Sequence, residues 1–239
     1  MERAAERCVL LFAVSAAAEA RAKRLGRAGV LLAYARRRLA AAVAELPGVD
    51  LLLVGEGAPS GARELPQRGS SFGERLENAF ADARARGYRD IVAVPGDVPQ
   101  LGADILRRAF ALLADHSTVL GPSPDGGVYL LGCRAEPRAL RTLLVGVAWR
   151  RASVFAELLA RSTGAAVLPP LADLDAPRDL AAVFSALSGA DLPADLIRLL
   201  ARLLSRAGIG RRERGRAPRR LLLADRRATR GPPAAAAAR

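Results

Sequence analysis

An aspartate lies at the end of the most strand-like segment in the sequence. Residues 91–95 are Ile, Val, Ala, Val and Pro, a short run that stops at a Pro-Gly pair, and Asp97 follows directly. Such a run is typical of a buried strand in an α/β sheet. Open α/β sheets bind their ligands at the carboxyl ends of strands, so Asp97 is a candidate ligand-binding carboxylate. The alternative is that Asp97 only caps the following helix.

A second acidic turn lies between two further strand-like segments. Asp125 is followed by Gly126 and Gly127, and the next run, from Val128, is apolar. Adjacent glycines let a backbone approach a bound sugar closely, because neither carries a Cβ and both tolerate positive φ. An Asp-Gly pair is also a strong hairpin signal, so an ordinary turn explains the same residues. The sequence leaves both interpretations open.

A third acidic segment comes late in the chain, where Asp173 and Asp175 precede Pro177. Residues two apart in an extended backbone point to the same side, so Asp173 and Asp175 would face one site. The alternative for Asp175 is an N-cap of the helix that begins with Pro177. The two interpretations are equally consistent with the sequence.

Strand-like and helix-like segments alternate along the chain. Short runs rich in Val, Leu and Ile predict strands, and apolar residues at three- and four-residue spacing predict helices. The strands are expected at residues 8–14, 49–54, 91–95, 118–120, 128–133 and 165–168. The helices are expected at residues 29–46, 74–86, 103–113, 137–144, 151–161, 177–187 and 191–207, with residues 15–20 as a loop. This alternation predicts a three-layer α/β/α sandwich around a mainly parallel, mixed sheet.

The chain divides into a nearly neutral body and a basic tail. We expect one α/β domain over residues 1–190, a C-terminal helix over 191–208 packed on it, and a disordered Arg/Pro/Ala-rich tail over 209–239. Residues 198–239 contain thirteen Arg and two acidic residues, which is +11 of the net charge of +13. Such a tail could bind nucleic acid or anionic lipid, but without interleaved aromatic residues a solvated tail is favoured.

Cysteine and hydropathy patterns favour a cytoplasmic protein. Cys8 and Cys133 are too few and too far apart for a disulfide framework and fit free thiols in a reducing compartment. No apolar run approaches the roughly 20 residues needed to span a bilayer, so no membrane partner is expected. Residues 8–18 could form the apolar core of a signal peptide, but the two preceding Arg are cancelled by two Glu, and the segment also suits a first strand.

Several sequence blocks occur together in an order that is typical of one superfamily. They are L-L-F-A-V-S…K-R-L (10–25), P-G-D-V-P-Q-L (95–101), L-G-P-S-P-D-G-G-V-Y-L-L-G (120–132) and P-L-A-D-L-D-A-P-R-D-L (170–180), with a weaker fifth, S-F-G-E-R-L-E-N-A-F (71–80). On these blocks the chain resembles the nucleotide-diphospho-sugar transferase superfamily, which has the glycosyltransferase-A fold. Within it, the chain looks most like a bacterial family of glycosyltransferase-like proteins labelled as a domain of unknown function. That family is similar to the guanylyltransferases of cofactor biosynthesis.

The resemblance implies chemistry on a nucleotide diphosphate. Negative charge on the departing diphosphate is usually stabilised by a divalent cation, Mg²⁺ or Mn²⁺, which carboxylates and phosphate oxygens hold. The resemblance implies that Asp97 and Asp175 are the metal ligands, and Asp173 is kept as an alternative ligand. It also implies a catalytic role for Asp97. Asp125 is implied as the second catalytic residue, which orients or deprotonates the acceptor hydroxyl.

The resemblance also implies the residues that hold the substrates. The residues implied to bind the nucleotide or its phosphates either carry a positive charge or lie at a helix N-terminus. They are Arg21, Lys23, Arg24, Gly73 and Arg75. Those for the acceptor or sugar are Gly126, Gly127, Tyr129 and Trp149. The alternatives are a core aromatic for Tyr129 and a helix-packing anchor for Trp149.

The first loop departs from the family pattern. The family has proline and glycine before a Lys-Thr-Arg-Leu run, whereas this chain has Glu19 at the glycine position and Ala22 at the lysine position. Lys23, one place along, or Arg21 would have to supply the cation. Glu19 is expected to repel phosphate.

These features favour an enzyme. The leading hypothesis is a metal-dependent transferase that uses a nucleotide sugar to glycosylate a small acceptor. A second hypothesis is a nucleotidyltransferase, in which a phosphorylated metabolite attacks a nucleoside triphosphate. A third is a degenerate, non-catalytic member of the fold that binds a ligand or partner, and a fourth is a nucleic-acid-binding protein acting through its tail.

Overall fold

Three apolar strands form the centre of the sheet. The computed structural model describes residues 6–56, 59–134, 137–149, 151–187 and 194–206. Strand β1 (Arg7–Ala13) pairs in parallel with β2 (Val49–Gly55) on one side and with β4 (Asp90–Pro95) on the other. The Val, Leu and Ile residues in the middle of these strands are buried, as continuous apolar runs in parallel sheets are.

The complete sheet has seven strands in the order β3-β2-β1-β4-β6-β5-β7. The other four strands are β3 (Arg63–Leu65), β5 (Thr118–Pro122), β6 (Val128–Cys133) and β7 (Ala166–Val167). Strand β6 runs antiparallel to both β4 and β5, whereas the other pairs are parallel. The mainly parallel, mixed sheet expected from the sequence is therefore confirmed.

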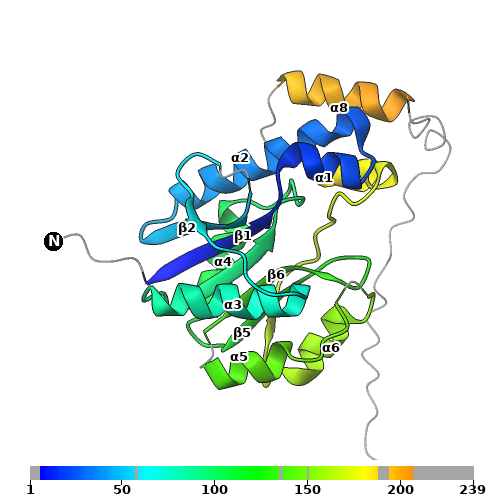
Figure 1. The fold of residues 1–239 in the computed structure, drawn as a ribbon. Helices are drawn as coiled ribbons and strands as arrows, with labels where there is room; N and C mark the ends of the chain where they lie inside the picture. The colour runs from blue at the N-terminus through cyan, green and yellow to red at the C-terminus, as the bar shows by residue number, and fades with distance from the viewer. Residues whose placement is uncertain (1–5, 57–58, 135–136, 150, 188–193, 207–239) are drawn as a thin grey trace, which may run out of the picture.

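Helices cover both faces of this sheet, as Figure 1 shows. They are α2 (Val30–Ala44), α3 (Phe72–Ala85), α4 (Ala103–Leu112), α5 (Pro137–Leu144) and α6 (Val154–Arg161). Alternate residues of β1 point to opposite faces. Val9 and Leu11 pack in a core with α2 and α4, while Cys8 and Leu10 pack in a core with α3, α5 and α6. The three-layer α/β/α architecture is confirmed.

The structure adds two elements where the sequence predicted loops. Ala16–Ala22 forms helix α1, and Ser15 Oγ accepts a hydrogen bond from Ala18 N at 3.2 Å at its N-terminus. Alanine has the highest helix propensity, but none of the α1 residues is buried, so no apolar periodicity marks the helix. The other addition, edge strand β3, has only three residues, which is too short for a pattern to reveal.

A third, smaller core joins the first loop to the end of the described chain. Its elements are the 3-10 helices η1 (Gly26–Gly29) and η2 (Pro177–Asp179) and helices α7 (Leu180–Leu187) and α8 (Ala194–Arg206). Leu25, Leu174, Leu180 and Leu200 are buried together in it. In Figure 1, α8 lies over the segment that contains α1. The segment after α1 is thus fixed against the segment that contains Asp175.

Two predictions about the C-terminal part of the chain fall on residues that the structure does not describe. The tail, residues 209–239, and the expected domain boundary at residue 190 both lie outside the described residues. Among the helices that the structure does describe, none has the length and apolar character needed to cross a membrane. Cys8 and Cys133 are both buried thiols, and burial raises the pKa of the Cys8 thiol.

Candidate functional site

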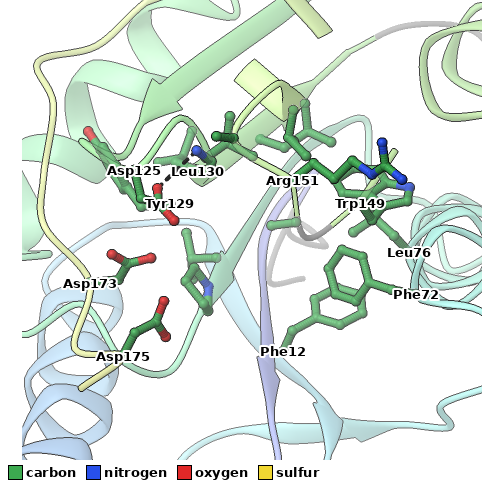
Figure 2. A pocket seen from close by; sticks show the side chains of 18 residues that line it. Phe12, Phe72, Leu76, Asp125, Tyr129, Leu130, Trp149, Arg151, Asp173 and Asp175 are labelled. Atoms are coloured by element: carbon green, nitrogen blue, oxygen red, sulfur yellow. Dashed lines mark hydrogen bonds between the residues drawn. The ribbon is translucent and has the colours of Figure 1, made fainter. Parts of the chain in front are cut away.

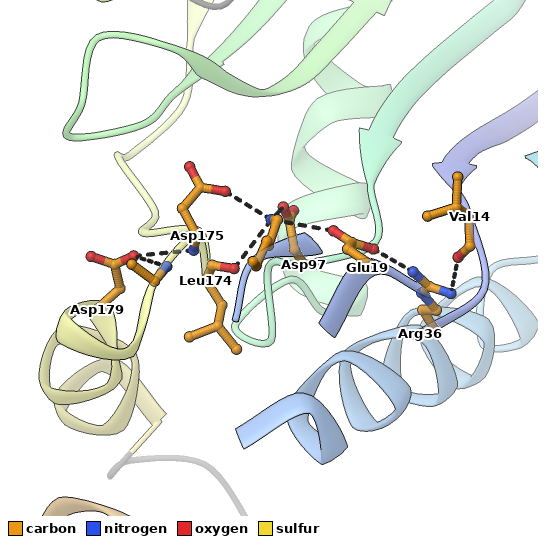
Figure 3. Close-up of polar contacts among 9 residues, drawn as sticks. Val14, Glu19, Arg36, Asp97, Leu174, Asp175 and Asp179 are labelled. Atoms are coloured by element: carbon orange, nitrogen blue, oxygen red, sulfur yellow. Dashed lines mark hydrogen bonds and ion pairs between the residues drawn. The ribbon is translucent and has the colours of Figure 1, made fainter. Parts of the chain in front are cut away.

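Asp97 lies at the carboxyl end of β4, in the turn that leads to α4. Its side chain is only 11% exposed, and its Oδ2 contacts Nζ of Lys23, which follows α1. The same ammonium donates to Oδ1 of Asp175 at 2.7 Å and to the carbonyl oxygen of Leu174 at 3.1 Å. The structure brings Asp97 and Asp175 together, because both carboxylates contact the Lys23 ammonium (Figure 3).

The Lys23 side chain is held in its charged form. Burial lowers the pKa of Lys23, but attraction to Asp97 and hydrogen bonds to Asp175 and Asp97 outweigh it, so the net shift of this pKa is upward. Of the three basic residues expected from the first loop to meet phosphate, Lys23 is the one directed at the carboxylates. Arg21 and Arg24 are exposed.

Glu19 also belongs to this charge cluster. Its Oε1 lies 3.2 Å from Lys23 Nζ, and its Oε2 lies 2.5 Å from Nη2 of Arg36. Arg36 is 4% exposed, and its Nη1 donates to the carbonyl oxygen of Val14 at 2.5 Å. Glu19 was expected to repel phosphate, but its charge is balanced by a cation on each side.

Sequence reasoning missed Arg36. It lies on the buried face of α2, four residues after Leu32 and three before Leu39. An arginine at that spacing within an apolar face is a signal that could have found it, because a buried guanidinium needs an anionic partner. Gly96 makes room for it, since a Cβ at residue 96 would lie 2.8 Å from Arg36 Nε.

Asp125, Asp173 and Asp175 form an acidic triad beside this cluster. Each offers a carboxylate oxygen, and the three oxygens lie within 4.8 Å of one another. Burial, followed by the charges of Asp175, Asp97 and Asp125, raises the pKa of Asp173 to about 7. Oxygens that ligate one Mg²⁺ lie within about 4.2 Å of each other, so a small inward movement would let the triad hold such an ion. Hard oxygen donors are the ligands that Mg²⁺ and Mn²⁺ prefer.

The turn that contains Asp125 is the Asp-Gly turn considered from the sequence. Gly127 N donates to Asp125 Oδ1 at 2.9 Å, and Gly126 N donates to the carbonyl oxygen of Ser123 at 3.0 Å. Gly126 has φ +89°, and a Cβ there would lie 2.0 Å from the carbonyl oxygen of Ala152. These glycines therefore serve the turn and its packing, and their role in binding a sugar stays a prediction.

A cavity of about 440 Å³ extends from the acidic triad at the carboxyl ends of β1 and β4. Its other side is formed by an aromatic wall of Phe12, Phe72 and Trp149 (Figure 2). The ring of Phe72 lies 6.1 Å from that of Phe12 and 5.1 Å from that of Trp149, centroid to centroid. Gly73 admits the indole, because a Cβ at Gly73 would lie 2.7 Å from Nε1 of Trp149. The cleft is acidic at one end and apolar at the other.

Other predicted binding residues have partners within the protein. Tyr129 is 1% exposed, and its hydroxyl donates to the carbonyl oxygen of Pro169 at 2.9 Å, as a core aromatic would. At the start of α3, Ser71 and Glu74 form a capping box. Arg75 Nε donates to the carbonyl oxygen of Gly69 at 3.1 Å. The Glu74 carboxylate therefore already caps the N-terminus of α3. Phosphate binding by Gly73 and Arg75 stays a prediction.

Comparison with known proteins places the chain in a family. Residues 17–151, more than half of the chain, match the family described as "Uncharacterized protein conserved in bacteria (DUF2064)". The chain belongs to the DUF2064 family. The matched region of this DUF2064 chain includes Asp97 and Asp125 and ends before Asp173. The family relationship inferred from the sequence blocks is confirmed.

Solved structures share the fold of the DUF2064 chain. A protein from Desulfovibrio desulfuricans, assigned as a nucleotide-diphospho-sugar transferase, is 21% identical and superposes with a TM-score of 0.71 over 84% of this chain and 98% of that one. A cytidylyltransferase from Leptospira borgpetersenii is 14% identical, with a TM-score of 0.52 over 85% of this chain and 96% of that one. At these identities the likeness establishes the fold. No curated protein matches the chain in sequence.

Proposed function

We propose that this protein is a transferase that takes a glycosyl group from a nucleotide sugar and passes it to a small acceptor. The observation that carries the proposal is the cleft at the strand ends, which places the acidic triad opposite the aromatic wall. A nucleotide sugar needs both features, because its diphosphate requires a cation-binding site and its planar base and sugar ring fit apolar surfaces. The fold shared with a nucleotide-diphospho-sugar transferase supports the same conclusion.

The acidic triad supplies the polar part of the reaction. Asp173 and Asp175 would hold Mg²⁺ or Mn²⁺, and the ion, when bound, would neutralise charge on the nucleoside diphosphate. Asp125 is fixed by the hydrogen bond from Gly127 N, so its other carboxylate oxygen is oriented to accept the proton of an acceptor hydroxyl. The roles proposed here thus separate the metal ligands from the general base.

The aromatic wall supplies the apolar part. Phe72 is 38% exposed, so part of its ring is open to a ligand. Trp149 lies edge-on to Phe72 and is partly buried, which fixes the shape of the wall before a ligand binds. Aromatic side chains bury large areas at low entropic cost, so the wall would contribute affinity and exclude water from the triad.

Thermal-shift screening tests this function. Nucleotide sugars and nucleoside triphosphates are tested with and without Mn²⁺, using wild type, Asp173→Asn and a matched control, Asp104→Asn. Asp104 is an exposed carboxylate on α4 that pairs with Arg107, away from the cleft. A nucleotide sugar should raise the melting temperature in a Mn²⁺-dependent manner in wild type and in the control, but not in Asp173→Asn.

Competing functions give different results in the same screen. A shift with nucleoside triphosphates and none with nucleotide sugars would indicate a nucleotidyltransferase, the reaction class of the cytidylyltransferase that shares this fold. No shift with any nucleotide would refute both enzyme functions and favour a binding protein.

A further inference from the structure

The Lys23 ammonium occupies the position that a metal ion would take between Asp97 and Asp175. Four oxygens surround it, from Asp97, Asp175, Glu19 and the backbone of Leu174. Three are carboxylate oxygens and one is a carbonyl oxygen, which is the hard-oxygen set that Mg²⁺ and Mn²⁺ prefer. A cation-binding cage is therefore present at Asp97, and the chain fills it with its own side chain.

Rigid parts of the fold build this cage. Leu174 is fully buried, and its N–H donates to the carbonyl oxygen of Asp97 at 3.0 Å, so the two backbones are joined beside the ammonium. Glu19 is anchored by the buried Arg36 guanidinium at 2.5 Å. Lys23 itself ends α1, where its backbone N–H donates to the carbonyl oxygen of Glu19 at 2.9 Å. Figure 3 shows the alternating charges from Arg36 to Asp175.

The charges of the cage argue against a metal ion beside Lys23. Glu19, Asp97 and Asp175 carry three negative charges, and Lys23 and Arg36 return two positive ones. A divalent cation at Asp97 would lie next to the ammonium in a largely buried setting, where like charges repel strongly. Without Lys23 the same cage would have an excess of two negative charges, which a divalent cation would balance.

We propose that Lys23 is the resident cation of Asp97. Asp97 is then not a metal ligand in the wild-type chain, and divalent cations are confined to the acidic triad on the far side of Asp175. Glu19 and Arg36 act as positioning residues, because they hold the ammonium in the cage without touching the substrate. The inference rests on the proposed function only in expecting a divalent cation in the cleft.

Direct Mn²⁺ binding tests the proposal without any nucleotide. Free Mn²⁺ is measured by electron paramagnetic resonance as it is titrated into the full chain. Asp97→Asn should keep the wild-type Mn²⁺ affinity within about twofold, because Asp97 does not contact the ion. Lys23→Met should bind one additional Mn²⁺ per chain, and the double variant Lys23→Met/Asp97→Asn should lose it again. Lys23→Arg keeps the positive charge and should gain no site.

Two results would overturn the proposal. One is a tenfold or greater loss of Mn²⁺ affinity in Asp97→Asn, since Asp97 would then be a ligand. The other is an unchanged Mn²⁺ stoichiometry in a folded Lys23→Met variant. If Lys23→Met does not fold, the Mn²⁺ affinity of Asp97→Asn still decides whether Asp97 is a metal ligand. Asp173→Asn separates this from the proposed function. Wild-type Mn²⁺ affinity in that variant would refute the triad site, whereas the Mn²⁺ stoichiometry of Lys23→Met would still decide whether Lys23 fills the cage at Asp97.

Discussion

Replacing Gly126 by alanine tests how the Asp125 turn is held. Gly126 has φ +89°, and an added Cβ would lie 2.0 Å from the carbonyl oxygen of Ala152 and 2.8 Å from its carbonyl carbon. Both neighbours are backbone atoms, so no rotamer change relieves the contact. Gly126 O also accepts a hydrogen bond from Phe155 N at 2.9 Å, which ties the turn to the start of α6. The clash must therefore move the turn or the helix.

Gly87→Ala is the matched control for this change. Gly87 has φ +98°, close to that of Gly126, but an added Cβ there would meet nothing within 4 Å. An alanine in the left-handed region costs about 1–2 kcal/mol, which should be the whole effect at Gly87. Overpacking against a fixed neighbour costs about 1–3 kcal/mol more. We therefore expect Gly126→Ala to lower the free energy of unfolding by about 2–5 kcal/mol.

Urea unfolding of the two variants, followed by circular dichroism, gives both free energies. Because both substitutions add one methyl group at positive φ, their difference isolates the contact with Ala152. If Gly126→Ala cost no more than Gly87→Ala, the packing of the turn against Ala152 would be refuted as a source of stability. A larger cost for Gly126→Ala would support the contact with Ala152 as a source of stability for the turn that carries Asp125.

Four further predictions concern the site. The pKa of Asp173 is about 7, so Mn²⁺ must displace its proton below that pH. Mn²⁺ affinity should therefore rise about tenfold from pH 6 to pH 8 in wild type, and it should be weak and independent of pH in Asp173→Asn. The folded state binds that proton more tightly than the unfolded state, so titration of Asp173 should lower stability as the pH rises from about 4 through 7. Arg36→Met removes the buried cation that pairs with Glu19 and should lower the free energy of unfolding in urea by about 3–5 kcal/mol. The control Arg37→Met, at an exposed neighbouring position, should lower it by less than about 0.5 kcal/mol. Gly73→Ala should push the Trp149 indole aside and shift the fluorescence maximum of this single tryptophan, and an unchanged spectrum would contradict the contact.

Much of the fold follows from local sequence patterns. The strands with unbroken Val, Leu and Ile runs lie close to where they were expected, since burial on both faces demands such runs. The proximity of Asp97 and Asp175 was implied by the family resemblance, which pairs them as metal ligands, and in the structure both carboxylates contact the Lys23 ammonium. Helix α1 could not be predicted, since its signal lies in alanine propensity rather than in an apolar face.

The contact between the Lys23 ammonium and Asp97 could not be predicted from the sequence. Lys23 reaches Asp97 because Ala16–Ala22 is helical, and a loop over the same residues would aim the side chain elsewhere. Glu19, one turn earlier, faces the same way for the same reason. Sequence reasoning treated Glu19 as an obstacle to phosphate because its partner Arg36, seventeen positions later, cannot be paired with it without the fold.

The cage around Lys23 joins segments that are far apart in the sequence. Lys23 and Leu174, which meet in it, are 151 positions apart in the chain. In a chain made from its N-terminus, Lys23 and Asp97 are synthesised before Leu174 and Asp175, which supply two of the four oxygens around the ammonium. A nascent chain that ends before residue 174 therefore cannot complete the cage around Lys23.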